Sequence, residues 1–176
     1  IPPNQWHIRP VLQIDCHDTA EVAIGLSCPS RNEETGEELV DVRTRLTIRQ
    51  HIPGDVIATF AYPSTIIEAT ESGQILSFNP DFYGGRIVEY LSNGRDRVML
   101  PGPCYRTDMV IHHGASGGPV AGPSGRVFGR NSTGFDGTND FYISRINEIF
   151  SLEIETGESD SITIQQLVNE GAVTVD

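Results

Sequence analysis

The sequence has no lysine and is poor in positive charge. All twelve basic residues are arginine, against 24 aspartate and glutamate residues, so the formal net charge at pH 7 is −12. Proteins that bind nucleic acid or anionic membranes need a basic face to neutralise phosphate groups. The composition therefore argues against both as partners. Seven acids and no basic residue follow Arg145, and we interpret this acidic end as solvated surface.

Long apolar runs are also missing. No segment approaches the ~20 apolar residues that a membrane-spanning helix needs, and the first residues lack the basic start and apolar run of a signal peptide. The odd set Cys16, Cys28 and Cys104 contains no Cys-x-x-Cys pair that would suggest zinc. We expect free thiols, with a Cys16–Cys28 disulfide left open. The sequence thus predicts a soluble protein, cytoplasmic rather than secreted, with no metal or organic cofactor.

Turn-forming residues are frequent. The chain holds 18 glycines and 11 prolines in 176 residues, which is typical of an all-β protein with short strands. Strand candidates recur at roughly eight to twelve residues, a spacing that predicts a barrel or sandwich. They are residues 11–14, 21–26, 39–48, 56–62, 64–70, 73–79, 86–91, 108–112, 118–121, 126–132 and 141–144. Helices are expected at 144–151 and 161–171, with a last strand at 172–175.

One motif points to chemistry. The run Gly114-Ala-Ser-Gly-Gly-Pro119 places a serine in a glycine-rich turn. A serine hydroxyl needs a base to take its proton and donors to hold the oxyanion it creates. Glycine at position 114 lets the backbone turn so that its N–H and that of Ser116 face one point. The alternative is an ordinary Gly-Pro turn between two strands.

The residues around this motif carry a resemblance. A short hairpin at 122–125 follows the serine turn, and the strand Phe128-Gly-Arg-Asn-Ser-Thr133 follows the hairpin. This arrangement resembles the C-terminal barrel of trypsin-like (chymotrypsin-fold) serine peptidases, nearest to bacterial and fungal forms. Residues 54–63 resemble the strand that opens the second barrel, and residues 17–24 resemble the strand that carries the acid of the catalytic triad. The resemblance covers roughly residues 10–150.

The resemblance implies an all-β fold of antiparallel barrels. The second barrel would be complete and the first partial, with a short C-terminal helix. Residues 1–52 would hold residual strands of the first barrel, including the acid strand. Residues 53–153 would form the barrel with the nucleophile, and residues 154–176 an acidic extension.

The resemblance also implies roles for individual residues. Ser116 would be the nucleophile, and the N–H groups of Gly114 and Ser116 would form the oxyanion hole. The edge that pairs with the backbone of a polypeptide substrate would be Ser132, Thr133 and Gly134. His113 or Asp136 would set the preference for a substrate side chain, although a surface role is equally open for either.

Two assignments remain for the acid. Matching Val22-Ala23-Ile24 to the family's hydrophobic-Ala-hydrophobic pattern puts the acid at Glu21, which can orient an imidazole as an aspartate does. Asp18 is the alternative, but it would leave Glu21 at an inward strand position, where an unpaired charge is costly. We favour Glu21.

The chain departs from the family at the base. The family's histidine lies in a Thr-Ala-x-His segment well before the acid strand, and the residues before Glu21 contain no such segment. None of the five histidines has the expected context. Ala115 also replaces the aspartate with which digestive relatives bind a freed N-terminal amine. We therefore expect an N-terminal fragment or partner chain to supply the histidine and complete the first barrel.

Three functions follow in order of preference. The first is a serine endopeptidase that works through an acyl-enzyme on Ser116 with a histidine from that complement. The second is an inactive pseudo-peptidase that binds protein or peptide. The third is an unrelated all-β structural domain, which predicts that the Gly114 and Ser116 amides do not converge.

Overall fold

Strands dominate the computed structural model of the chain. It describes residues 10–28, 31–32, 34–38, 44–70, 73–112, 114–134, 138, 140–155 and 161–176. Within these ranges there is one short α-helix, α1 (Ile164–Asn169), and one 3-10 helix, η1 (Asn147–Ser151). No helix in the described residues is long and apolar enough to cross a membrane.

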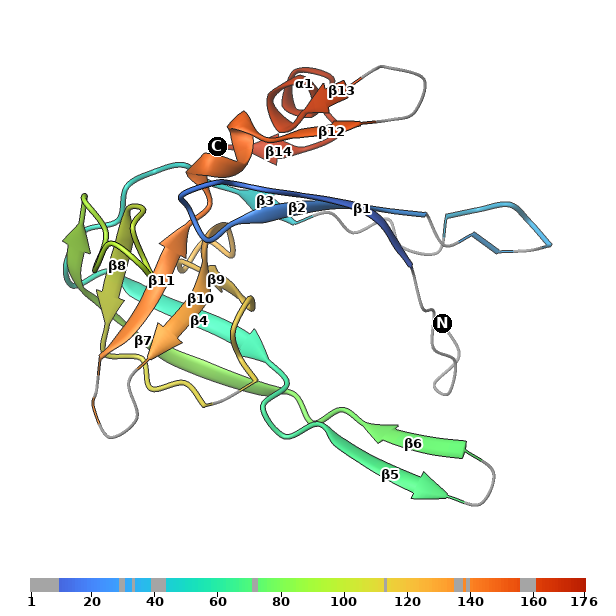
Figure 1. The fold of residues 1–176 in the computed structure, drawn as a ribbon, viewed down its shortest axis with the longest axis horizontal. Coiled ribbons are helices and arrows are strands. Elements are labelled where there is room, and N and C mark those ends of the chain that lie inside the picture. The colour runs from blue at the N-terminus through green and yellow to red at the C-terminus, as the bar shows by residue number, and fades with distance from the viewer. Residues whose placement is uncertain are drawn as a thin grey trace.

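Six strands form a closed barrel (Figure 1). They are β4 (Val56–Ala61), β7 (Asp81–Leu91), β8 (Cys104–Thr107), β9 (Pro119–Ala121), β10 (Val127–Gly134) and β11 (Phe141–Arg145). Their order is β11-β8-β7-β4-β9-β10, and β10 pairs back with β11 to close the ring. Every pairing within the ring is antiparallel. The prediction of an all-β antiparallel barrel is confirmed.

Alternation along the strands builds the barrel core. In β4 the side chains of Ile57, Thr59 and Ala61 are buried, and those of Val56 and Ala58 are exposed. This alternation has the period of two that is expected for a strand with one face toward solvent. The same inward set continues around the ring and packs into one cluster. Its fully buried members are Ile57, Ile87, Tyr105, Met109, Val120, Phe128 and Ile143.

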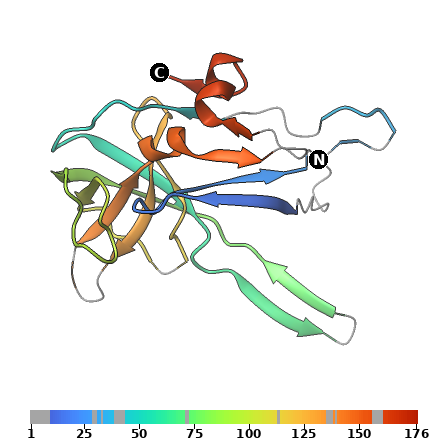
Figure 2. The same cartoon turned by 45° about the horizontal axis from the view of Figure 1, so that its top comes forward.

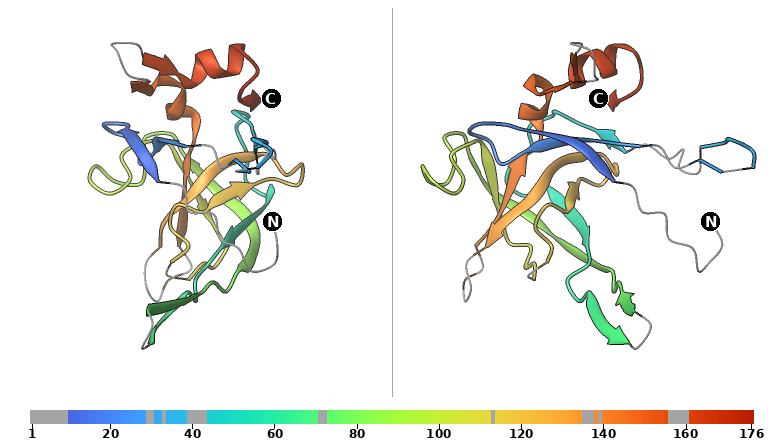
Figure 3. Two further views of the ribbon diagram at one scale, coloured as in Figure 1. Left: turned by 90° about the vertical axis from the view of Figure 1, so that its right-hand side faces the viewer. Right: turned by 45° about the vertical axis from the view of Figure 1, so that its right-hand side comes forward.

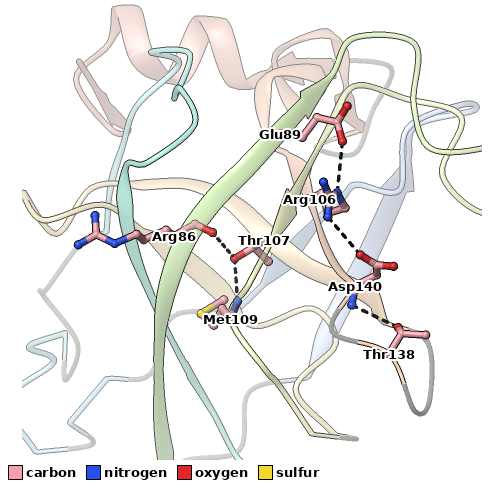
Figure 4. Close-up of polar contacts among 7 residues, drawn as sticks. All are labelled: Arg86, Glu89, Arg106, Thr107, Met109, Thr138 and Asp140. Atoms are coloured by element: carbon pink, nitrogen blue, oxygen red, sulfur yellow. Dashed lines mark hydrogen bonds and ion pairs between the residues drawn. The ribbon is translucent and has the colours of Figure 1, made fainter.

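Strand β8 was predicted in the wrong place. The expected strand at 108–112 lies instead at Cys104–Thr107, directly after Pro103. The Thr107 hydroxyl donates to the Arg86 carbonyl at 2.9 Å and accepts the Met109 amide at 3.0 Å, so the ladder with β7 ends at this residue (Figure 4). Proline has no N–H to donate to a strand ladder, and β8 begins at the residue that follows Pro103.

Arg106 ties three barrel segments together on the surface. Its guanidinium lies 3.2 Å from Glu89 on β7 and 3.3 Å from Asp140 just before β11 (Figure 4). The Glu89 contact, more than the others, raises the pKa of Arg106. Because all three side chains are a third or more exposed, this network adds little to stability and mainly fixes how the strands align.

Two hairpins extend outward from the barrel (Figures 1 and 2), and the turn of the first contacts β10 through Glu21. The first is β1 (Val11–Cys16) with β2 (Ala23–Ser27), and the second is β5 (Ile66–Thr70) with β6 (Gly73–Ser77). Every residue of β5 and β6 is exposed, on both faces of the hairpin. On β1 the side chains of Val11, Leu12 and Ile14 are more than half exposed. Both hairpins thus present apolar surface to solvent.

The C-terminal residues form a small layer over one end of the barrel (Figure 3). Strand β12 (Glu153–Glu155) pairs with β13 (Ser161–Thr163), and β14 (Thr174–Val175) pairs in parallel with β3 (Arg45–Leu46). Thr163 and Gln166 cap α1 reciprocally. The expected helix at 161–171 therefore begins only at 164, and the expected helix at 144–151 is a 3-10 helix. The domain boundaries at 52 and 153 stay predictions.

All three cysteines are free. The register of the first hairpin pairs Cys16 with Ala23 and Val11 with Ser27, so Cys16 and Cys28 lie at opposite ends and no disulfide joins them. Cys104 is fully buried, and burial raises the pKa of its thiol to about 11.

We predict that native protein reacts with a maleimide at two of its three cysteines. Cys16 and Cys28 are exposed, whereas the buried Cys104 thiol is both inaccessible and protonated at pH 7. Mass spectrometry should show two adducts without denaturant and three in guanidinium chloride, and one adduct for native Cys16→Ser. Native labelling of Cys104 as fast as that of Cys16 would contradict the barrel core described here.

Candidate functional site

A tight turn presents Ser116 at one end of the barrel, between β8 and β9. Gly114 and Gly117 have φ values of 88° and 85°, the left-handed region that glycine tolerates best. Ala115 between them is buried, while Ser116 is exposed. The Gly118 amide donates back to the Ala115 carbonyl at 3.0 Å and closes the turn. The conformation therefore requires the glycines that flank the serine.

Asn131 fastens this turn to strand β10. Its carbonyl accepts the Gly117 amide and its amide donates to the Gly118 carbonyl, both at 2.8 Å. Its side-chain Nδ2 donates to the Ala115 carbonyl at 3.3 Å and to Thr59 Oγ1 at 2.7 Å. Asn131 is fully buried, so both ends of the turn depend on one interior amide. Sequence reasoning missed this residue.

The backbone amides of Gly114 and Ser116 stay outside the barrel ladder. Among the described residues, neither amide has a hydrogen-bond acceptor. Gly114 packs against the backbone of Tyr62 and Pro63, which a Cβ at this position would approach at 3.4–3.5 Å. An added Cβ at Gly118 would approach the carbonyl of Phe60 at 3.1 Å. Backbone from the end of β4 and the two residues after it thus lies against one side of the turn.

Ser132 connects the Ser116 turn with the N-terminal hairpin. Its carbonyl accepts the Ser116 hydroxyl at 3.1 Å, and its own hydroxyl donates to Glu21 Oε2. Arg130 Nη2 lies 3.2 Å from the same Glu21 oxygen. Two residues 95 positions apart in the sequence (Glu21 and Ser116) therefore meet on either side of one serine.

The structure separates the two acids that the sequence proposed. Glu21 is half-buried and contacts β10, whereas Asp18 is exposed and has no hydrogen bond to Ser132 or Arg130 within the described chain. Both line a pocket of about 600 Å³ at the turn of the first hairpin, together with Cys16, His17 and Arg130. Which of the two acids acts in a reaction stays a prediction, with geometry on the side of Glu21.

The expected substrate edge is irregular. The pairing of β10 with β11 shifts register between Asn131 and Gly134, so Ser132 and Thr133 lie in a bulge. An added Cβ at Gly134 would meet the Phe141 ring at 2.6 Å, which keeps this position small. A bulge at the end of a strand frees main-chain groups from the ladder. His113 and Asp136, the other proposed substrate contacts, lie outside the described residues.

Three of the five histidines lie in the described ranges, and none is hydrogen-bonded to Ser116. His17 Nδ1 accepts the amides of Thr19 and Ala20 at 3.2 and 3.0 Å, so this ring stabilises a turn. His51 pairs with Asp55, the residue directly before β4. His112 lies edge-on to Tyr83, with ring centroids 5.9 Å apart. Over the same ranges, no three His, Cys, Asp or Glu residues are grouped as a metal would require.

Comparisons with known proteins identify the fold. No family model and no curated protein matches the sequence. Among solved structures, the inactive form of the Rv3671c protease matches 80% of this chain with a TM-score of 0.51 and 18% sequence identity. A serine-to-alanine mutant of Rv3671c from M. tuberculosis matches 93% of the chain with a TM-score of 0.50, also at 18% identity.

The chain spans 62% and 65% of the length of these two protease structures. At this level of identity the likeness concerns architecture. The closed six-stranded antiparallel barrel and the matched neighbours together show that the chain has the chymotrypsin-like fold of serine proteases.

Proposed function

We propose that this chain is the nucleophile-bearing part of a serine endopeptidase that cleaves polypeptides through an acyl-enzyme on Ser116. One observation carries the proposal: the Ser116 hydroxyl and the Glu21 carboxylate meet through Ser132. Ser116 bonds to the main-chain carbonyl of Ser132 and Glu21 to its hydroxyl, and a nucleophilic serine and an ionisable acid are two of the three members of a catalytic triad. The third member, an imidazole, would lie between them.

The histidine would come from a polypeptide segment outside this sequence that completes the first barrel. The exposed apolar side chains of Val11, Leu12 and Ile14 on β1 support such a segment, because a strand added there would cover them. The segment would place one imidazole nitrogen toward Ser116 and the other toward Glu21. Ser132 contacts both Ser116 and Glu21, the two residues between which this imidazole would lie.

The reaction would run in two halves. The imidazole takes the Ser116 proton as the oxygen attacks the substrate carbonyl, and the tetrahedral oxyanion is held by the Gly114 and Ser116 amides. The imidazolium then gives the proton to the leaving amine, which departs as the acyl-enzyme forms. Water, deprotonated by the same imidazole, releases the acid product and restores the hydroxyl. The bulged edge at Ser132 and Thr133 would pair with the substrate backbone.

A second candidate is a pseudo-peptidase that binds polypeptide without cleaving it. The Arg130–Glu21 ion pair favours this candidate, because a guanidinium already satisfies the carboxylate that an imidazole would need. The two candidates share the cleft and differ in whether Ser116 is activated.

We predict that a fluorophosphonate probe labels Ser116 once the histidine-bearing segment is present. The probe reacts only with an activated serine beside an oxyanion site. Ser116→Ala should abolish labelling, and Ser124→Ala should leave it unchanged, because Ser124 lies in another exposed glycine-containing turn. Peptide mapping locates the adduct. Absence of labelling in the assembled protein would favour the pseudo-peptidase.

We predict that the 176-residue chain alone hydrolyses peptide esters several orders of magnitude more slowly than the assembled protein. Proton removal from Ser116 is unassisted without a base, and loss of the histidine costs about as much as loss of the whole triad. Single-turnover ester hydrolysis measures the rate. Turnover by the pure chain that Ser116→Ala removes would show that the chain contains its own base.

We predict that Asn131→Ala destabilises the fold by about 1–3 kcal/mol, because it leaves the Ala115 carbonyl and Thr59 without their buried donor. The loosened turn should also slow fluorophosphonate labelling of Ser116. Asn79→Ala is the matched control, since it removes an exposed amide bond to the Ser64 carbonyl, and it should change stability by less than about 0.5 kcal/mol. Urea unfolding measures both, and equal effects of the two variants would refute the role given to Asn131.

A further inference from the structure

Four aromatic side chains gather where β4 leads into the β5–β6 hairpin and where the hairpin returns into β7 (Figure 1). Phe60 lies opposite Phe82 in the β4–β7 ladder, with ring centroids 4.8 Å apart. The Tyr62 ring centroid lies 5.0 Å from that of Phe60 and 5.8 Å from that of Phe78. We call Phe60, Tyr62, Phe78 and Phe82 the aromatic cluster.

The aromatic cluster lies on the solvent side of the barrel wall. Phe60 takes the outward position of the alternation along β4, between the buried residues Thr59 and Ala61. Phe82 is 76% exposed, and Tyr62 is also exposed. Large apolar side chains that are grouped on a surface are typical of binding sites, since each of them can bury a large area against a ligand.

The cluster adjoins the Ser116 turn. Strand β9, which begins three residues after Ser116, pairs with β4 on one side and with β10 on the other. A Cβ added at Gly118 would approach the Phe60 carbonyl at 3.1 Å, so the backbone that carries this ring borders the turn. A Cβ added at Gly117 would meet nothing within 4 Å. The surface directly after Ser116 is therefore open.

The strand order gives the direction in which a substrate would cross the turn. In the proposed peptidase, the acyl part of the polypeptide pairs with the β10 edge at Ser132 and Thr133, and the scissile carbonyl lies at Ser116. The chain beyond that carbonyl passes to the other side of the turn, where the Tyr62 carbonyl lies against Gly114. Neighbouring strands are about 4.8 Å apart, and an extended chain advances about 3.3 Å per residue. About three residues therefore cover the two strand spacings from β10 to β4.

We propose that the aromatic cluster binds a large apolar side chain of the substrate, aromatic or branched, within about three residues on the leaving-amine side of the cleaved bond. This inference rests on the proposed function and adds a substrate preference to it. Aromatic rings give the cluster both faces and edges for contact with such a side chain. Asp81, which is exposed and accepts the Phe82 amide at 2.8 Å, places a carboxylate beside the cluster. An acidic substrate residue is therefore disfavoured there.

The same observations favour a substrate over a second copy or a lipid surface. The cluster is continuous with the Ser116 turn, and the open surface at Gly117 joins the two. The chain has a formal net charge of −12, which opposes close approach of another copy or of anionic headgroups.

Disulfide tethering at position 116 tests this subsite without any reaction at a serine. The full chain carries Ser116→Cys together with Cys16→Ser and Cys28→Ser, so that the buried Cys104 is the one other thiol. It is equilibrated in mercaptoethanol with equal amounts of the blocked peptides Cys-Ala-Phe and Cys-Ala-Ala, and intact-protein mass spectrometry measures the two mixed disulfides. We expect the Phe peptide to be favoured about fivefold or more, because its ring buries apolar area on the cluster. Equal amounts of the two adducts would overturn the proposal.

Two variants of the tethering chain locate the preference. Phe82→Ala should bring the adduct ratio close to one, and the exposure of Phe82 makes a loss of folding unexpected, which circular dichroism checks. Ile52→Ala is the matched control, because Ile52 is an exposed apolar residue before the opposite end of β4. It should leave the ratio unchanged. A preference that survives Phe82→Ala, or that Ile52→Ala removes equally, would place the Phe ring outside the cluster and refute the subsite.

Failure of this proposal is distinguishable from failure of the proposed function. Tethering involves no acyl-enzyme, so absence of fluorophosphonate labelling in the assembled protein would count against the peptidase and leave the adduct ratio as it is. Sedimentation equilibrium and flotation with phosphatidylcholine vesicles test the other occupants on the wild-type chain. A dimer or a vesicle-bound form that Phe82→Ala abolishes would show that a second copy or lipid covers the cluster, and would overturn the proposal.

Discussion

The buried amide of Asn131 is the constraint on which the candidate site depends. The turn around Ser116 contains two left-handed glycines and is short of ladder hydrogen bonds, so its own backbone does not fix its shape. Asn131 supplies main-chain bonds to Gly117 and Gly118 and a side-chain bond to Ala115. Since Asn131 is part of β10 in the closed barrel, these bonds fasten the turn to the barrel. The main-chain groups and Nδ2 of Asn131 are hydrogen-bonded, whereas its buried Oδ1 has no partner among the described residues, so the geometry of the turn is specified at the cost of one unsatisfied oxygen.

The groups bonded to Glu21 determine how strongly its carboxylate could stabilise an imidazolium. Arg130 and Ser132 both bind one oxygen of the Glu21 carboxylate. In a triad, that carboxylate stabilises the imidazolium that forms during the reaction. A guanidinium 3.2 Å away competes for the same negative charge, and Arg130 is only partly exposed. Arg130 would thus weaken the electrostatic stabilisation of an imidazolium by Glu21, unless the proposed histidine-bearing segment displaces the Arg130 guanidinium.

Much of the barrel could be predicted from the sequence because its signals are local. Strand β4 alternates in and out, and glycine or proline separates most neighbouring strands. Strand β8 was misplaced because the burial of Tyr105 depends on strands far away in sequence. The short hairpin of β12 and β13 was missed because three-residue strands carry almost no periodic signal.

The candidate site, like the barrel, could be predicted from the sequence only where its signals are local. The flanking glycines make Ser116 visible in the sequence, since few other roles require them. Asn131 was missed because a buried amide and a surface amide look the same in a sequence. The contact between Glu21 and Ser132 joins residues 111 positions apart, so the pattern around Glu21 suggested an acid without showing what it would touch.

The closed barrel and the two hairpins differ in how their strands are stabilised. The barrel closes on itself, so its strands leave no open edge apart from the short β3 and β14 addition. An isolated two-stranded hairpin is marginal in water, and the β1–β2 and β5–β6 hairpins both expose apolar side chains. The β1–β2 hairpin, which carries Glu21 at its turn, is held by contacts outside itself: Glu21 bonds to Ser132 and Arg130 of β10, and Asp15 accepts the Glu153 amide at the start of β12. The barrel thus positions both Ser116, through Asn131, and Glu21, through Ser132 and Arg130, whereas the strand β1 exposes apolar side chains. In the proposed peptidase, a complement that covers β1 would bury this apolar surface.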